Sequence, residues 1–140
     1  MCVVMVCSDM QEADQVGHCL QELNTGYLVT YCKAEDLLRN APSGMVALVI
    51  VATDDSPPVL RGALHWLRRR WPGCPITMVG DAGYGDHEMI AREGGATFLT
   101  RPVSPEQWAA ILLHALHHAG VEVPKADVGW YAPDGRQATG

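Results

Sequence analysis

A few side chains in this sequence could do covalent chemistry or hold a cation, and they stand where apolar runs end. Cys7 closes the first apolar run, and Asp54 and Asp55 come two and three residues after the third run, which ends at Ala52. A thiolate or a carboxylate can act as a nucleophile. Carboxylates can also hold a hard cation such as Mg²⁺. The candidate chemistry is therefore nucleophilic attack by Cys7 or by Asp54 or Asp55.

Other candidate residues favour a structural role. His114, His117 and His118 have i, i+3 and i+4 spacing, which could hold a transition metal, but no Asp, Glu or Cys nearby in the sequence completes a site. We expect these histidines in the solvated last turn of a helix, where the dipole favours them, and we expect no metal or other cofactor. The odd number of cysteines and the lack of a CxxC pair predict reduced, mostly buried thiols, at Cys2, Cys7, Cys19, Cys32 and Cys74.

Five short apolar runs alternate with helical patterns. Strands are expected at 2–7, 27–32, 46–52, 76–79 and 96–99, and helices at 9–24, 34–40, 59–71, 86–93 and 105–118. This alternation predicts a parallel sheet with helices on both faces. Right-handed crossovers then make a flavodoxin-like (βα)5 three-layer sandwich with strand order 2-1-3-4-5 the simplest α/β topology.

Length and composition limit the classes of function. The 140 residues fit one domain, expected at 1–120, with 121–140 as a flexible tail or linker. No apolar run is long enough to cross a membrane, and the start lacks the pattern of a signal peptide, so we expect a cytoplasmic location. The net charge of −6, with Arg68-Arg69-Arg70 as the only basic cluster, argues against nucleic acid binding by this domain.

Two motifs carry a resemblance to a known family. The passage from Trp71-Pro72-Gly73 to Val79 and the passage Gly95-Ala96-Thr97-Phe98-Leu99-Thr100-Arg101-Pro102 occur at the expected spacing within five strand–helix units. Together they resemble the receiver domain of bacterial response regulators over about residues 2–118. The resemblance implies a scaffold in which an aspartate accepts a phosphoryl group. It also implies a cis peptide bond between Arg101 and Pro102.

The same resemblance implies that the phosphoryl site is degenerate. The phosphoacceptor position falls on Ala52, which has no nucleophile, and the Ser/Thr position at the end of the fourth strand falls on Gly80. The acidic pair that holds magnesium falls on Cys7 and Ser8. Neither is a good ligand for that hard cation, and Asp9 stands just beyond the pair.

The remaining functional position is a lysine in the family and is Arg101 in this chain, which keeps the charge but changes the hydrogen-bonding geometry. We therefore interpret the chain as a pseudo-receiver that is not an enzyme and acts by binding a protein partner in signalling. The last helix carries a second apolar stripe, Ala109, Leu113 and Leu116. If exposed, this stripe would serve as an interaction face or as part of a homodimer through the fourth helix, fifth strand and fifth helix. The equally open alternative is that the helix simply buries a wide apolar face in the core.

Three alternatives stay open. Asp54 or Asp55 could accept phosphate, with Asp9 helping to hold magnesium. Cys7 could serve a small enzyme or carrier, since its position resembles the phosphocysteine of sugar-transport IIB domains, although the residues after it offer no glycine to cradle a phosphate. The emptied pocket could also sense a small molecule or an anion held by Arg101.

Overall fold

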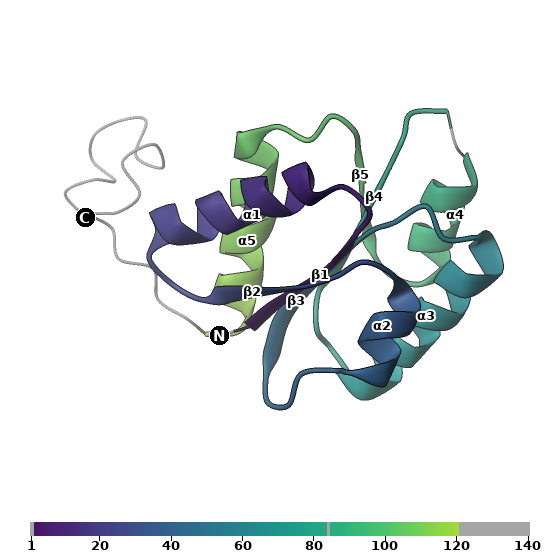
Figure 1. Cartoon of the computed structure of the whole chain (residues 1–140), viewed down its shortest axis with the longest axis horizontal. Coiled ribbons are helices and arrows are strands. Elements are labelled where there is room, and N and C mark those ends of the chain that lie inside the picture. Colours follow the sequence, from purple (N-terminus) through teal and green to yellow (C-terminus); the bar gives the residue numbers. More distant parts are fainter. Residues whose placement is uncertain (1, 84, 121–140) are drawn as a thin grey trace.

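A computed structural model of the chain describes residues 2–83 and 85–120. In this part of the chain five parallel strands form one sheet in the order β2-β1-β3-β4-β5 (Figure 1). The strands are β1 (Cys2–Cys7), β2 (Tyr27–Tyr31), β3 (Val46–Ala52), β4 (Ile76–Gly80) and β5 (Thr97–Thr100). The helices between and after them are α1 (Met10–Leu23), α2 (Ala34–Arg39), α3 (Pro57–Arg70), α4 (Gly85–Glu93) and α5 (Pro105–His118). The flavodoxin-like (βα)5 fold is confirmed, whereas the tail expected at 121–140 lies outside the described residues.

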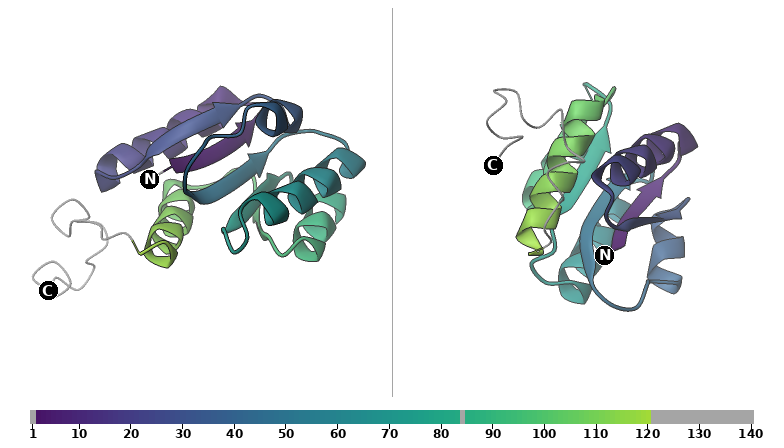
Figure 2. Two further views of the ribbon diagram at one scale, coloured as in Figure 1. Left: turned by 90° about the horizontal axis from the view of Figure 1, so that it is seen from below. Right: turned by 90° about the vertical axis from the view of Figure 1, so that its left-hand side faces the viewer.

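Helices cover both faces of the sheet, so the molecule has three layers (Figures 1 and 2). One buried cluster joins the sheet to α1 and α5, and a second joins it to α2, α3 and α4. Strand β1 shows how the sequence supplies both clusters, because successive side chains of a strand point to opposite faces. Val3 and Met5 belong to the first cluster, and Val4 and Val6 belong to the second. Every residue of β1 is therefore buried, as expected for a central strand covered on both sides.

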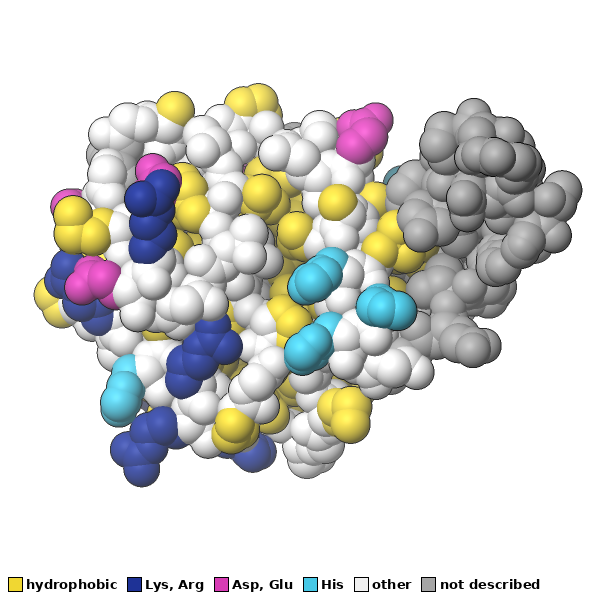
Figure 3. Space-filling view, turned by 180° about the vertical axis from the view of Figure 1, so that it is seen from behind, with side chains coloured by type: hydrophobic (Ala, Val, Ile, Leu, Met, Phe, Trp, Pro, Cys, Tyr) yellow, Lys and Arg dark blue, Asp and Glu magenta, His cyan; other side chains and the backbone are white. Residues whose placement is uncertain are grey.

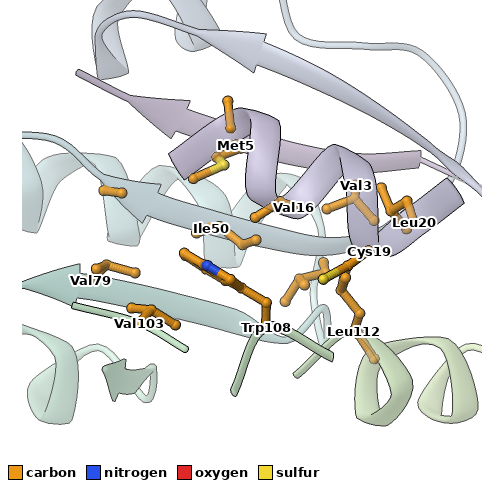
Figure 4. Packing of buried hydrophobic residues seen from close by; sticks show 14 of the residues in the cluster. Val3, Met5, Val16, Cys19, Leu20, Ile50, Val79, Val103, Trp108 and Leu112 are labelled. Atoms are coloured by element: carbon orange, nitrogen blue, oxygen red, sulfur yellow. The ribbon is translucent and has the colours of Figure 1, made fainter. Parts of the chain in front are cut away.

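Trp108 of α5 is the largest fully buried side chain of the first cluster. It lies among Val16, Ile50 and Val103, which come from α1, β3 and the segment before α5 (Figure 4). Its indole Nε1 donates to the side-chain oxygen of Gln15 over 2.9 Å, so the one polar atom of the ring is satisfied. Burial of this aromatic side chain fixes α1 and α5 against the same face of the sheet.

Local signals explain where the helices begin. Asp9 caps α1 by accepting from a backbone N–H of its first turn, and Ser104 forms a capping box with Gln107 at the start of α5. Helix α3 begins at Pro57, two residues earlier than the apolar pattern predicted. A proline is well suited to a first helical position, because its N–H would have no partner there and its φ is already helical.

The second apolar stripe of α5 is largely inside the core. Ala109 and Leu116 are buried, and Leu113 is half-buried and packs against the same cluster as Trp108. Of the two interpretations left open, the wide buried face therefore holds for Ala109 and Leu116, and an exposed interaction face at these two residues is wrong. Within the described residues, no helix combines the length and the apolar character needed to span a membrane.

Candidate functional site

The residues expected at the degenerate phosphoryl site meet at the carboxyl edge of the sheet. Cys7 and Ala52 end β1 and β3 and lie opposite each other, and the N–H of Ser8 donates to the carbonyl of Ala52 over 3.4 Å. Gly80 ends β4, and its carbonyl accepts from the backbone N–H of Arg101 at 2.9 Å. Ligands of open parallel sheets bind beyond these strand ends. The peptide bond between Arg101 and the proline after it is cis, as the resemblance implied.

The side chain of Arg101 lies across this edge and is bonded to Glu12 of α1. Its Nε and Nη2 donate to the two carboxylate oxygens of Glu12 over 3.0 and 3.1 Å. Nη2 also donates to the backbone carbonyl of Ala52 over 3.1 Å. The side chains of Arg101 and Glu12 are only 22% and 10% exposed. A guanidinium is thus bonded to the backbone of the phosphoacceptor position, and a carboxylate holds it there in bidentate geometry.

Carboxylates surround the guanidinium of Arg101. Burial by itself would lower the pKa of Arg101, but the hydrogen bonds and negative charge of Glu12 outweigh it, with smaller contributions from Asp81 and Asp54, and the pKa is raised. Asp81 lies 3.6 Å from Nη1. Because an opposite charge already neutralises Arg101 at bonding distance, an incoming anion would have to displace Glu12. This pairing weighs against an anion held by Arg101.

The donor set at this edge does not fit Mg²⁺. Cys7 contributes a buried thiol, and Ser8 contributes a neutral hydroxyl. The carboxylate of Asp9 already accepts a backbone N–H of α1 over 2.9 Å. Magnesium prefers carboxylate oxygens and water, and the charged group bonded to Ala52 is itself a cation, Arg101. These residues therefore do not support a magnesium-dependent reaction at this site.

Neighbouring side chains fill the space next to Gly80. A Cβ at this position would lie 3.0 Å from Cε1 of Phe98 and 3.2 Å from Cβ of His87. Both distances are shorter than ordinary contacts between carbon atoms. A Ser or Thr at position 80 would therefore press on the ring of Phe98. The replacement by glycine has not opened a cavity at this point, which weighs against a small molecule in the emptied pocket.

Asp54 and Asp55 face different surroundings. The carboxylate of Asp55 accepts from the hydroxyl of Thr53 over 2.8 Å and from the backbone N–H of Ala34 over 3.3 Å. Asp55 therefore stabilises the loop and the first turn of α2, a structural role for an acidic residue. Asp54 is exposed and contributes only electrostatically to Arg101. Neither replaces a carboxylate at position 52.

Cys7 lies in the first core cluster and is 2% exposed. Burial raises the pKa of its thiol, and the nearby ionisable groups Cys32, Glu12 and Asp9 raise it further. A cysteine nucleophile or phosphate carrier needs a lowered pKa and access to its substrate. The environment of Cys7 provides neither, so it supports the structural interpretation of this thiol.

The histidines of α5 form no metal site within the described residues, where no group of three suitable ligands occurs. The rings of His114 and His118 stack with their centroids 6.5 Å apart. Nε2 of His118 lies 3.2 Å from the backbone carbonyl of Gly73. Figure 3 shows the histidine side chains together on the surface of the last helix, as the sequence predicted for its solvated end.

Glu12 is the site residue that the sequence did not reveal. It stands three residues after the helix cap Asp9, a spacing that is typical of a capping box. In the structure its carboxylate bonds to Arg101 instead. The available signal was a glutamate in the first turn of a helix that starts at the sheet edge. That signal gives no indication of a partner in a distant loop.

No protein-family profile matches the chain, and no curated protein is similar to it in sequence. Solved structures share its fold. An uncharacterized protein from Neptuniibacter caesariensis has a TM-score of 0.72 at 15% identity, over 85% of this chain and 89% of that one. The chemotaxis response regulator CheY4 of Vibrio cholerae has a TM-score of 0.68 at 19% identity, over 82% and 98%.

The BeF3-activated receiver domain of DrrB, from Thermotoga maritima, has a TM-score of 0.67 at 20% identity, over 83% of this chain and 97% of that one. These similarities establish that the chain has the fold of response-regulator receiver domains. At such low identity they do not extend to activity, because one fold hosts many functions. Function has to be argued from the site itself.

Proposed function

We propose that this chain is a receiver-like regulatory module of the cytoplasm that acts by binding a protein partner and does not accept a phosphoryl group. The observation that carries the proposal is the bidentate pair of Arg101 and Glu12, bonded to the backbone of Ala52. A phosphoaccepting site needs a carboxylate nucleophile, a cation on the transferring oxygens and a free positive group opposite. This site has Ala52 at the nucleophile position, Cys7 and Ser8 at the positions of the acidic pair, and a positive group, Arg101, that is already paired with Glu12.

The pair also supports a single, permanent state of the sheet edge. Glu12 belongs to α1, and Arg101 belongs to the loop between β5 and α5, so their bond ties two elements together without any ligand. Removing one partner of a fully buried pair costs about 3–5 kcal/mol, and the partial exposure of this pair reduces the cost to roughly 2–3 kcal/mol. A phosphoryl group would have to supply that free energy before it could use Arg101. A module built in this way presents one conformation to its partner at all times.

Intact mass spectrometry after incubation with acetyl phosphate and Mg²⁺ tests the absence of phosphoryl transfer. We expect no gain of a phosphoryl mass under conditions in which an active receiver domain gains one. An adduct that disappears in Asp54→Asn or Asp55→Asn would contradict the proposal and support an atypical phosphoacceptor. An adduct that disappears in Cys7→Ser would contradict it in favour of a cysteine carrier.

A further inference from the structure

A groove between α2 and α3, on the other face of the sheet from α1 and α5, has no role in the site described above. Its volume is about 890 Å³. Its walls include Leu38 of α2 and Val59 of α3, which are 40% and 45% exposed, and the half-buried Trp66. Large apolar side chains exposed together along one groove indicate a contact surface.

Gly62 lies in the middle of α3 and lines this groove. A glycine inside a helix costs roughly 0.5–1 kcal/mol relative to alanine. A Cβ at Gly62 would have no atom of the described domain within 4 Å, so no close contact requires a glycine at this position. The glycine leaves the wall of the groove without a side chain at this position.

The far end of the groove is basic. Arg69 and Arg70 line it and are exposed, and neither forms an ion pair with a described residue. Arg70 lies over the ring of Trp71 at 5.3 Å. The one acidic residue among the lining side chains, Glu35, is already paired with an arginine of its own helix. Helix α3 has no acidic residue at all, in a chain whose net charge is −6.

The basic character of α3 is therefore local and not a property of the whole surface. Figure 3 shows lysine and arginine side chains on the half of the molecule that contains α3 and α4, with acidic side chains among them, so the local excess of positive charge rests on the composition of α3 itself. Arg68, which precedes the two unpaired arginines Arg69 and Arg70, donates within the domain to the carbonyls of Gly94 and Cys74. Arg70 contacts the ring of Trp71, but neither it nor Arg69 forms an ion pair with a described residue. Arg69 and Arg70 are left to meet a negative charge from outside.

We infer that this groove binds an acidic segment of a protein partner that carries at least one large apolar side chain. The apolar side chain would lie over Gly62, between Leu38 and Val59. Gly62 and Arg69 are seven residues apart, which is two helical turns or roughly 10 Å along α3. The acidic side chains of the partner would therefore stand about 10 Å from its apolar anchor. The inference rests on the proposed function only in that the domain acts by binding a protein.

Selection from a phage-displayed library of random dodecapeptides against the full chain tests the groove. We expect the enriched peptides to combine acidic residues with a large apolar residue. Fluorescence polarisation should show that Gly62→Trp, which fills the groove, and Arg69→Glu/Arg70→Glu, which reverses its charge, each weaken binding by about tenfold or more. The matched control is Gly17→Trp, at a helical glycine of α1 that also has open space around it. It should leave the affinity within about twofold.

Several results would overturn the inference. These are a selection without enrichment, enriched peptides without acidic residues, and peptides whose binding is unaffected by Gly62→Trp. Tighter binding of a mixed-sequence single-stranded oligonucleotide than of any peptide, lost in Arg69→Glu/Arg70→Glu, would assign the surface to nucleic acid instead. Peptides whose binding is lost only in Gly17→Trp would refute this groove as the binding site. They would leave the proposal that the domain binds a protein. A phosphoryl adduct, in contrast, would refute the proposed function and not the groove.

Discussion

Replacing Glu12 with glutamine should destabilise the domain much more than the loss of a surface ion pair. Glu12→Gln keeps the shape of the side chain but leaves a guanidinium that is 22% exposed without its bidentate partner. Two charge-assisted hydrogen bonds are weakened, each worth about 1.5 kcal/mol or more. Partial exposure lets water recover some of this, so we expect a loss of roughly 2–3 kcal/mol in the free energy of unfolding. The corresponding decrease in Tm is about 6–12 °C for a domain of this size.

A double-mutant cycle isolates the pair. The variants are Glu12→Gln, Arg101→Met and the double variant, with stability measured by urea unfolding and circular dichroism. We expect a coupling free energy above about 1 kcal/mol. The matched control is the exposed pair of Glu88 and Arg92 on α4, whose side chains are 46% and 77% exposed and whose N–O distance is 2.7 Å. The same cycle there should give only about 0.3–0.5 kcal/mol.

Equal coupling in the two cycles would refute the reasoning, because Glu12 would then not hold Arg101 more firmly than a solvated pair does. A second measurement follows the cation directly. If Glu12 is what makes Arg101 unavailable, inorganic phosphate should raise the Tm of Glu12→Gln more than that of the wild-type chain. An equal effect of phosphate on both proteins would refute the claim that Glu12 makes Arg101 unavailable to anions. It would leave the claim that the pair stabilises the domain.

Two further predictions concern the thiols. In the native chain at neutral pH, Ellman's reagent should react rapidly with one cysteine, the exposed Cys32, and Cys32→Ser should abolish this rapid phase. Cys7 is buried and has a raised pKa, so a rapid reaction of Cys7 would instead support a nucleophilic role for it. Burial raises the pKa of Cys74 from 9.0 to about 11, so the neutral thiol contributes stability that is complete below the lower value and is lost as the pH rises through the higher one. The free energy of unfolding, measured with urea across this pH range, should therefore fall more steeply for the wild-type protein than for Cys74→Ala. Equal slopes for the two proteins would contradict the attribution of this pH dependence to Cys74.

The fold was accessible from the sequence because its signals are local. The run of buried residues in β3 marks a central strand, and Ser104 followed by Pro105 marks the start of α5. The second stripe of α5 could not be placed from the sequence, and the reason is physical. Helical periodicity identifies apolar faces, but it does not say how many neighbouring elements each face will meet, so whether Ala109 and Leu116 are exposed or buried stayed open until the structure showed them buried.

The sequence by itself determined which functional groups are absent from the site. Ala52 has no nucleophilic atom and Gly80 has no hydroxyl, whatever the surrounding structure is. Only the tertiary structure decided what replaced them. Arg101 and Glu12 are 89 residues apart, and their bond exists because sheet register and helix packing bring α1 and the β5–α5 loop to one edge. Side-chain partners at that separation follow from packing, which no local pattern encodes.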